Sequence, residues 1–362
     1  MKKIFKGKKV LITGHTGFKG SWLTLWLYSL GAKIIGISDN IPYKNSHFSL
    51  LNIKNKISHN LEDIRNYKKI EKIILKTKPD FIFHLAAQSL VQKSYNYTLD
   101  TWEVNLMGTV NMLEVLKKIK NNCTAIFVTS DKCYFNAEQA WGYRENDKLG
   151  GKDPYSGSKG SAELAIFSYF NSFFKNSKKI RIGIGRAGNV IGGGDWAEGR
   201  IVPDCMRSVI KNKNVILRNP NSTRPWQHVL EPLSGYLSLA SNLSKSKKLN
   251  GEAFNFGPQL DQNFNVKELV IEMKKNWSNV KWKISATNKK KYEASLLKLN
   301  FDKALHYLDW KPVWNFNETS FFTSNWYKNF FQNKKKNIYK YSLSQLNLFI
   351  KKAKEKKLKW AQ

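Results

Sequence analysis

Tyr155 and Lys159 stand four residues apart in the segment PYSGSK, a spacing suited to proton chemistry. On a helix, residues i and i+4 are neighbours, so both side chains would project from one face. A tyrosine with its ordinary pKa of about 10 is a poor base at neutral pH, but a neighbouring ammonium favours the phenolate. The pair is therefore suited to take a proton from a hydroxyl while a hydride leaves the same carbon.

Three more candidates follow a short apolar run, in the segment TSDKCY. Ser130 would stand at the carboxyl end of a strand, where ligands bind in α/β sheets, and can hydrogen-bond the reacting hydroxyl. Interconversion of an alcohol and a ketone needs only the serine, the tyrosine and the lysine. The adjacent Asp131 and Lys132 therefore indicate a second reaction that uses an acid and a base. The alternative is a surface pair without a role.

The segment TGHTGFKG holds Gly14, Gly17 and Gly20 between a predicted strand and a predicted helix. Glycines at this place allow a tight turn and let the backbone approach a pyrophosphate at the helix N-terminus. The spacing is GxxGxxG, which differs from the GxGxxG of many dehydrogenases. A loop that serves only helix packing is the alternative. We expect a bound dinucleotide.

Asp39 follows the second predicted strand, at the interval where an acidic side chain contacts the adenosine ribose of NAD. Asn40 could make that contact instead, and an ordinary cap is the other interpretation of Asp39. No arginine stands in the next ten residues to receive a 2′-phosphate, which favours NAD over NADP. His84 lies inside an apolar run and is interpreted as a core residue. No metal site is expected, because no cluster of histidine and acidic residues has ligand spacing.

The elements that would position these residues are short apolar runs separated by segments of helical length. The runs occupy residues 9–13, 33–38, 81–86 and 125–129, with 180–185 and 253–256 as late strands. This alternation predicts βαβ crossovers and an α/β fold with a doubly wound parallel sheet. From residue 189 the chain turns to loops that contain Gly, Pro and Trp, which predicts a smaller, interleaved unit. We expect a dinucleotide-binding domain over 1–188 with the late strand near 253–256, a mainly substrate-binding domain over 189–332, and a lysine-rich, helical tail over 333–362.

Composition narrows the class of protein. The 362 residues suffice for two structural units, and 41% hydrophobic content excludes wholesale disorder. The formal charge of +34 would suit a nucleic acid, but only 8 of the 61 basic residues are arginine, so we expect no such partner.

The longest apolar stretch, 22–30, is too short to cross a bilayer, and no secretory segment is apparent. We expect a cytoplasmic protein without membrane insertion. Its three cysteines lack the spacing of a disulfide framework or a zinc site.

Six strings carry a resemblance, in the order TGHTGFKGSWL, FHLAAQ, VTSDKCY, WGYRENDKLGGKDPYS, RAGNVIGGGDW and RPWQHVLEPLSGY. From about residue 7 to 330 the chain resembles the CDP-glucose 4,6-dehydratases, extended short-chain dehydrogenases/reductases of the nucleotide-sugar epimerase/dehydratase family. The resemblance implies a Rossmann-type sheet, bound NAD and a cytoplasmic homo-oligomer, either a dimer or a tetramer. It also implies conversion of CDP-glucose to CDP-4-keto-6-deoxyglucose, a precursor of deoxysugars in surface polysaccharides such as O-antigen.

The resemblance further implies a reaction cycle. Tyr155, with Lys159 and Ser130, would oxidise C4 of the glucose; water would then leave from C5 and C6, and the hydride would return to C6. The related dTDP-glucose dehydratases use an Asp-Glu pair for the elimination, whereas this chain has Asp131 and Lys132. Which of the two acts as acid therefore stays open. Our hypothesis is that Asp131 protonates the departing hydroxyl and that Lys132, or a water it positions, removes the C5 proton.

Binding residues are carried over from the resemblance by motif position. For the cofactor they are Gly14, Gly17, Phe18 and Gly20 at the pyrophosphate, Asp63 and Ile64 at the adenine, and Leu85, Ala86, Ala87 and Asn105, beside Tyr155 and Lys159, at the nicotinamide. For the sugar nucleotide they are Asn189, Arg200, Arg218, Arg224 and His228. The planar guanidinium group of arginine can donate two parallel hydrogen bonds to phosphate oxygens, so these arginines suit a diphosphate. Arg200 and Arg218 could also be surface residues. Another nucleotide-sugar 4,6-dehydratase, a 4-epimerase and a non-catalytic NAD-binding module remain the alternative functions.

Overall fold

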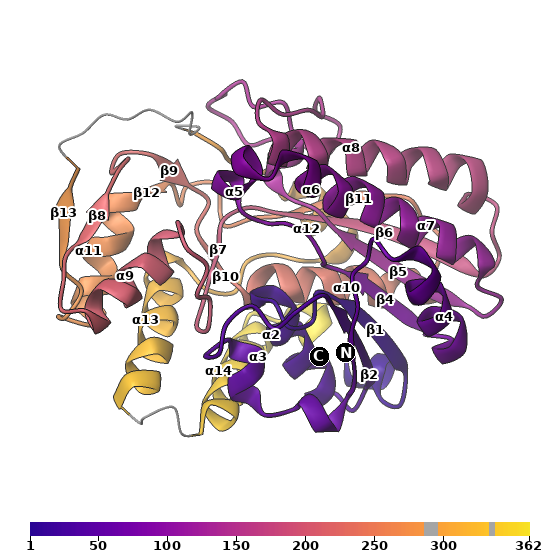
Figure 1. Ribbon diagram of the computed structural model, residues 1–362, viewed down its shortest axis with the longest axis horizontal. Coiled ribbons are helices and arrows are strands. Elements are labelled where there is room, and N and C mark those ends of the chain that lie inside the picture. The colour runs from indigo at the N-terminus through magenta and orange to yellow at the C-terminus, as the bar shows by residue number, and fades with distance from the viewer. Residues whose placement is uncertain (286–295, 333–336) are drawn as a thin grey trace.

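A seven-stranded sheet forms the centre of the computed structural model, which describes residues 1–285, 296–332 and 337–362 (Figure 1). The strand order is β11-β6-β5-β4-β1-β2-β3, and each neighbouring pair is parallel. The strands are β1 (Lys9–Thr13), β2 (Lys33–Ser38), β3 (Ser58–Leu61), β4 (Phe81–His84), β5 (Cys123–Val128), β6 (Ile180–Ala187) and β11 (Ala253–Phe256). The predicted α/β class with a doubly wound parallel sheet is confirmed.

Side chains on the strands alternate between the two faces of the sheet, since successive residues of a strand point in opposite directions. Leu11 packs into one apolar core with Ile82 of the neighbouring strand. Val10 and Ile12 pack into the other core, on the opposite face. Because both faces are buried, the strands appear in the sequence as continuous apolar runs.

Helices cover both faces. Residues of α4 (Tyr67–Thr77), α7 (Gly108–Lys118) and α8 (Pro154–Tyr169) pack on one face, in the core that holds Leu11. The other core includes residues of α2 (Phe18–Ser29), α10 (Leu230–Lys245) and α14 (Ile338–Glu355). Further helices are α1 (Lys2–Phe5), α3 (His47–Leu51), α5 (Val91–Asn96), α6 (Thr98–Trp102) and α12 (Asp302–Leu308).

A second group of elements lies beside the sheet, at the left of Figure 1. Its small sheets pair β8 with β13 and β9 with β12, and β7 pairs with β10. The elements are β7 (Val190–Ile191), α9 (Ile201–Ile210), β8 (Val215–Leu217), β9 (Thr223–Arg224), β10 (Gln227–His228), β12 (Phe264–Asn265), α11 (Val266–Asn276), β13 (Trp282–Ile284) and α13 (Phe316–Gln332). The chain leaves the central sheet after β6, returns to it for α10 and β11, and then adds β12, α11, β13 and α13. This group of elements, the inserted unit, is therefore built from segments before and after the last central strand.

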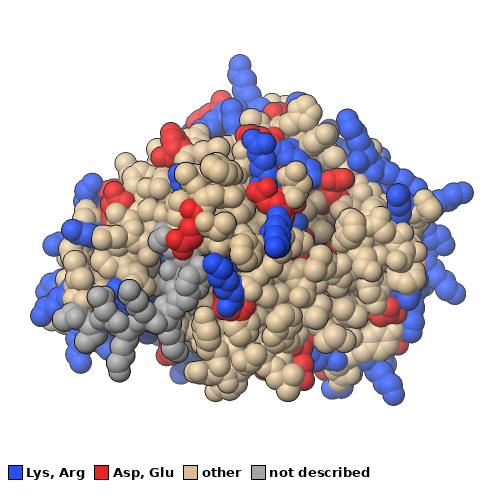
Figure 2. Space-filling view, turned by 90° about the horizontal axis from the view of Figure 1, so that it is seen from above, with Lys and Arg blue, Asp and Glu red and all other residues tan. Residues whose placement is uncertain are grey.

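The lysine-rich C-terminal segment forms α14, which packs on the body through Leu346 and Phe349, both fully buried. Within the described residues, no helix combines the length and the apolar character that a membrane crossing requires. In Figure 2, basic side chains are spread around the periphery of the visible face with acidic side chains among them. The positive charge on that face is therefore dispersed.

The sequence analysis missed β3, which is the edge strand beside β2. Its sequence, SHNL, contains a single apolar residue, and that residue, Leu61, is 52% exposed. An edge strand without a buried apolar side chain has no hydrophobic periodicity to detect. Backbone pairing with β2 and the hydrogen bond between His59 and His15 hold this strand in place.

Candidate active site

A cavity of about 750 Å³ lies at the carboxyl ends of the parallel strands. Its wall comes from the loops after β1, β2, β4, β5 and β6 and, on the other side, from the inserted unit. This is the edge at which open α/β sheets bind ligands. The predicted site residues that line it are Gly14, Gly17, Phe18, Gly20, Asp39, Asn40, Asp63, Ile64, Leu85, Ala86, Ala87, Ser130, Asp131, Lys132, Tyr155, Lys159, Asn189, Arg200, Arg218 and Arg224.

The glycine loop between β1 and α2 packs too tightly to admit side chains. A Cβ on Gly20 would lie 2.0 Å from the Gly14 carbonyl oxygen, and a Cβ on Gly14 would lie 2.9 Å from the Ala86 nitrogen. Gly14 has a φ of +74°, a conformation that favours glycine. Helix α2, whose N-cap is Gly17, can therefore begin at the cavity wall, where its unpaired N–H groups are available to an anion.

Asp39 and Asn40, at the end of β2, form one polar unit on the same wall. Asn40 donates from its backbone nitrogen to Asp39 Oδ1 and from Nδ2 to Asp39 Oδ2, each at 2.9 Å. Either residue could therefore contact a ribose. Asp63 is engaged differently: its carboxylate accepts from Arg65 at 2.6 Å, and this hydrogen bond lowers the pKa of Asp63.

The start of α8 explains how the tyrosine and the lysine reach the cavity. Asp153 caps the helix by accepting from the Ser156 nitrogen at 3.0 Å, and Pro154 occupies the first turn. Proline suits this position because it has no N–H to satisfy. The helix therefore starts in register for Tyr155 and Lys159 to share one buried face, 7% and 6% exposed.

The end of β5 places three further polar groups in the wall. Ser130 caps the short helix η3 (Asp131–Cys133), accepting from the Lys132 nitrogen at 3.2 Å, and donates to Asp131 Oδ1 at 2.8 Å. Asp131 is 2% exposed, and its Oδ2 has no hydrogen-bond partner in the part of the chain that the structure describes. A buried carboxylate oxygen without a partner points to a missing ligand. Asp131 and Lys132 thus both line the cavity, and their role as acid and base stays a prediction.

Burial dominates the electrostatics of the Tyr155 and Lys159 pair. It raises the pKa of Tyr155 to about 12, although a hydrogen bond with Ser130 acts to lower that pKa. It also lowers the pKa of Lys159 to about 8. The protein alone therefore holds the phenol more firmly protonated than water does, so Lys159 by itself does not produce the predicted phenolate. A further positive charge in the cavity would be needed to do so.

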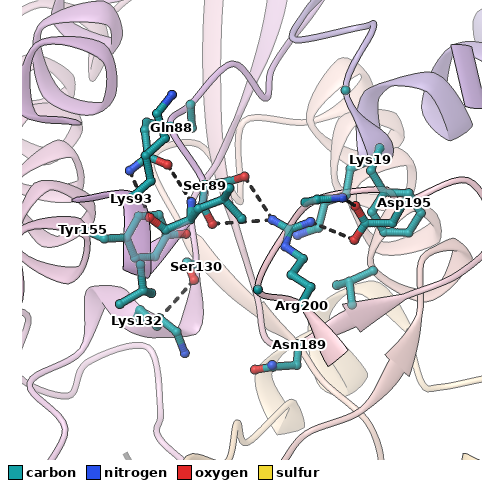
Figure 3. A pocket seen from close by; sticks show the side chains of 18 of the residues that line it. Lys19, Gln88, Ser89, Lys93, Ser130, Lys132, Tyr155, Asn189, Asp195 and Arg200 are labelled. Atoms are coloured by element: carbon teal, nitrogen blue, oxygen red, sulfur yellow. Dashed lines mark hydrogen bonds and ion pairs between the residues drawn. The ribbon is translucent and has the colours of Figure 1, made fainter. Parts of the chain in front are cut away.

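The structure adds polar residues that the sequence analysis missed. Arg200 donates from Nη1 to Asp195 Oδ2 at 2.9 Å and from Nη2 to Ser89 Oγ at 3.0 Å (Figure 3). Lys19, in the glycine loop, also lines the cavity, and burial together with the charge of Arg200 lowers its pKa to about 8. Lys19 and Asp195 stand inside the motifs GFKG and GGGDW, whose polar residues were the available signal.

Two predicted contact residues do not line the cavity. Asn105 is buried behind the wall, where it donates to Ser158 Oγ at 2.9 Å and accepts from the Gln88 nitrogen at 2.9 Å. Its amide is used to join the loop after β4 to α8. His228 is fully buried, with its ring edge-on to Trp314 at a centroid distance of 4.8 Å. His228 thus packs outside the lining of the cavity, and direct contact of either residue with a ligand stays a prediction.

The residues present fit a dinucleotide. The glycine loop leaves no room for a Cβ on Gly14 or Gly20, α2 offers its N-terminus, and the Asp39–Asn40 unit follows the next strand of the sheet. Small apolar residues, Leu85, Ala86 and Ala87, continue the wall from the end of β4. This order matches a pyrophosphate, a ribose and a flat ring along the carboxyl edge.

A parallel sheet with a glycine loop after β1, a serine at the end of β5 and a Tyr-x-x-x-Lys pair on α8 is the arrangement typical of the extended short-chain dehydrogenases/reductases. The model of the family described as GDP-mannose 4,6 dehydratase matches residues 11–320, and the chain belongs to this family.

Similar proteins include two curated relatives. The chain is 44% identical over 332 residues to the CDP-glucose 4,6-dehydratase of Salmonella typhimurium, a match that covers 90% of this chain and 92% of that protein. It is 27% identical to the CDP-paratose 2-epimerase of Salmonella typhi, over 84% of this chain and 94% of that one.

Solved structures with the same fold include a UDP-glucose 4-epimerase from Thermotoga maritima, with a TM-score of 0.77 and 20% identity, covering 89% of this chain and 99% of that one. The dTDP-glucose 4,6-dehydratase of Bacillus anthracis has a TM-score of 0.73 and 21% identity, covering 89% and 97%. At this identity, the two structures support the fold alone.

Proposed function

We propose that the protein is an NAD-dependent hydro-lyase that converts CDP-glucose to CDP-4-keto-6-deoxyglucose. The observation that carries the proposal is the juxtaposition, in one cavity, of Ser130, Asp131 and Lys132 with the pair Tyr155 and Lys159. A redox set beside an additional acid and base suits a reaction that combines oxidation with elimination. The 44% identity to a CDP-glucose 4,6-dehydratase supports the same activity.

Tyr155 is the proposed base for the first step. It would take the proton of the C4 hydroxyl, while Ser130 holds the same oxygen by a hydrogen bond. When bound, NAD would supply the uptake of a hydride from C4 and its later return to C6. Because burial raises the pKa of Tyr155 to about 12, the positive charge brought by the oxidised cofactor would act with the Lys159 ammonium to lower it.

Asp131 and Lys132 would carry out the elimination. The 4-ketone acidifies the C5 proton, which Lys132, or a water it positions, removes while the C6–O bond breaks and a C5=C6 double bond forms. Asp131 protonates the departing hydroxyl, so the products are an enone and water. The geometry suits this division because Asp131 Oδ1 is occupied by Ser130 while Oδ2 is unpartnered among the described residues.

The inserted unit would bind the sugar nucleotide. Arg218 and Arg224 line the cavity on that side with Asn189, and guanidinium groups suit a diphosphate. Arg200 lies between the two halves of the cavity (Figure 3). We also propose that the enzyme is a cytoplasmic homo-oligomer that supplies deoxysugars for surface polysaccharides such as O-antigen.

A turnover assay with CDP-, dTDP-, UDP- and GDP-glucose side by side tests the proposal. We expect a product from CDP-glucose whose absorbance rises in alkali, as for a 4-keto sugar, and slower reactions with the other three. Equal rates would contradict the choice of cytosine. Conversion to the C4 epimer without that absorbance would establish a 4-epimerase instead. Purified protein that carries no NAD and binds none would contradict any redox function.

A further inference from the structure

Three buried side chains follow one another at four-residue intervals along α8: Tyr155, Lys159 and Glu163. They are 7%, 6% and 2% exposed. Residues at this spacing are neighbours on a helix, so a phenol, an ammonium and a carboxylate succeed one another on one face. The first two belong to the proposed mechanism, whereas the third has no role in it.

Glu163 joins α8 to the two neighbouring strands. Its Oε1 accepts from Thr129 Oγ1 at 2.5 Å and from Arg186 Nε at 2.9 Å, and its Oε2 accepts from Arg186 Nη2 at 2.9 Å. Arg186 belongs to β6, while Thr129 lies directly after β5 and before Ser130. The carboxylate thus holds the backbone position from which the catalytic serine projects.

Arg186 is anchored by further hydrogen bonds besides those to Glu163. Its Nη1 donates to Tyr134 Oη at 2.6 Å and to the Glu145 carbonyl oxygen at 2.9 Å. The Tyr134 hydroxyl in turn donates to Asn255 Oδ1 at 2.8 Å. This network holds the Glu163 carboxylate in one orientation. A buried ion pair is weak evidence for stability, because desolvation offsets its attraction, so its place beside the catalytic pair needs another explanation.

The charge of Glu163 matters because of what else faces Lys159. The groups that do so are Glu163 on α8, Cys133 on η3, His84 on β4 and Lys19 on α2. Burial raises the pKa of Cys133 well above its usual value and lowers the pKa of His84 to about 3, so both are neutral near pH 7. Lys19 is a base and can only repel a second cation. Of these four, Glu163 acts most strongly to favour the ammonium form of Lys159.

Tyr155 itself faces Ser130, Asp131, Asp153 and Arg200. The two carboxylates disfavour its phenolate, and Arg200 favours it. For the phenol to act as a base, the positive charge of Lys159 has to offset the two carboxylates and lower the pKa of Tyr155.

We propose that Glu163 is a positioning residue of the active site, which keeps Lys159 cationic and, through Thr129, fixes Ser130 beside Tyr155. The inference rests on the proposed function, because it takes Tyr155, Lys159 and Ser130 as the catalytic set.

The test is the titration of Tyr155 in the NAD-saturated protein, followed by the ultraviolet absorbance of tyrosinate. Each protein is compared with the same protein carrying Tyr155→Phe, so that only this phenol contributes to the difference. We expect Glu163→Gln to raise the midpoint by about one pH unit or more, since an opposite charge at this range shifts a pKa by about 1 to 3 units. Glu163→Asp, which keeps the charge, should restore most of the shift.

Glu231→Gln is the matched control. Glu231 is also a buried carboxylate, 1% exposed, and accepts from the Val313 and Trp314 nitrogens at 2.9 and 2.8 Å. Its loss should destabilise the fold without moving the Tyr155 midpoint. If Glu163→Gln moves the midpoint no further than Glu231→Gln does, the proposal is overturned.

Thr129→Val serves as the second variant, which keeps the charge and remains informative if Glu163→Gln does not fold. We expect kcat for CDP-glucose to fall about tenfold, as for a loss of about 1.4 kcal/mol of transition-state stabilisation, with KM unchanged and with a Tyr155 midpoint that moves less than in Glu163→Gln. An unchanged kcat overturns the positioning of Ser130. The titration needs no substrate, so a shifted midpoint in a protein that does not turn over CDP-glucose would refute the proposed function while upholding the role of Glu163.

Discussion

Arg200 and Asp195 form an ion pair in the wall of the cavity, with 2.9 Å between Nη1 and Oδ2. The other guanidinium nitrogen donates to Ser89, which lies on the sheet side of the cavity. One side chain thus connects the inserted unit with the loop after β4. The planar fork of arginine allows this, because its donors point in two fixed directions.

The first prediction concerns that fork. Arg200→Lys keeps the charge but cannot hold both partners, so we expect KM for CDP-glucose to rise about tenfold, equivalent to about 1.4 kcal/mol, with a smaller change in kcat. Arg207→Lys is the control, since Arg207 pairs with Asp204 and does not line the cavity. Steady-state kinetics measure both, and equal KM values in the two variants would contradict a substrate-binding role for Arg200.

Loss of the Tyr155 hydroxyl should abolish the first step. We expect Tyr155→Phe to lower kcat by about 10² to 10⁴, the usual contribution of a general base, while NAD binding measured by calorimetry persists. Tyr236→Phe is matched to it: Tyr236 is fully buried, and its hydroxyl has no hydrogen-bond partner among the described residues. Activity retained by the Tyr155 variant would remove the support for a catalytic phenol.

Replacement of Lys132 should separate oxidation from elimination. In Lys132→Met, we expect proton exchange at C5 with deuterated water, and release of water, to fall by about 10² or more. Nuclear magnetic resonance of the sugar measures the exchange. Lys93→Met controls for the loss of any lysine from the wall, because Lys93 also lines the cavity. Water release at the parent rate would show that Lys132 is not the base.

The buried histidines make stability depend on pH. Burial lowers the pKa of His15 to about 4 and that of His47, His84 and His228 to about 3, from 6.5. Between the folded pKa of about 3 and the unfolded pKa of 6.5, the unfolded chain binds more protons than the folded protein. The stability that comes from burying these neutral histidines is therefore present above pH 6.5 and is lost as the pH falls from 6.5 towards 3. While the pH lies between the folded and the unfolded pKa of a histidine, each pH unit downward lowers the free energy of unfolding by about 1.4 kcal/mol for that histidine.

His228→Phe tests this dependence on one residue, and also tests its removal from the substrate site. Phenylalanine keeps the aromatic contact with Trp314 but cannot be protonated. We expect the free energy of unfolding, from urea titrations, to fall less steeply below pH 6.5 than in the parent. KM for CDP-glucose should stay the same. An equally steep fall, or a raised KM, would contradict the buried, non-contacting role.

Much of the site could be predicted from the sequence because its signals are local. The glycine loop, the serine at the end of β5 and the Tyr155 and Lys159 spacing each lie within one short segment. Apolar runs also determined β1, β2 and β11 to the residue, since strands buried on both faces leave a continuous pattern. Local order along the chain thus determined the fold class and the carboxyl edge at which the site forms.

Tertiary structure alone decided which polar residues meet and which are withdrawn. Arg200 reaches Ser89, 111 positions away in the sequence, and Glu163 on α8 pairs with Arg186 on β6. Asn105 and His228 carry suitable chemistry, but packing turns them into supports behind the wall. The physical reason is that burial and pairing depend on neighbours brought together by the whole fold, and no periodicity or spacing in the sequence records those neighbours.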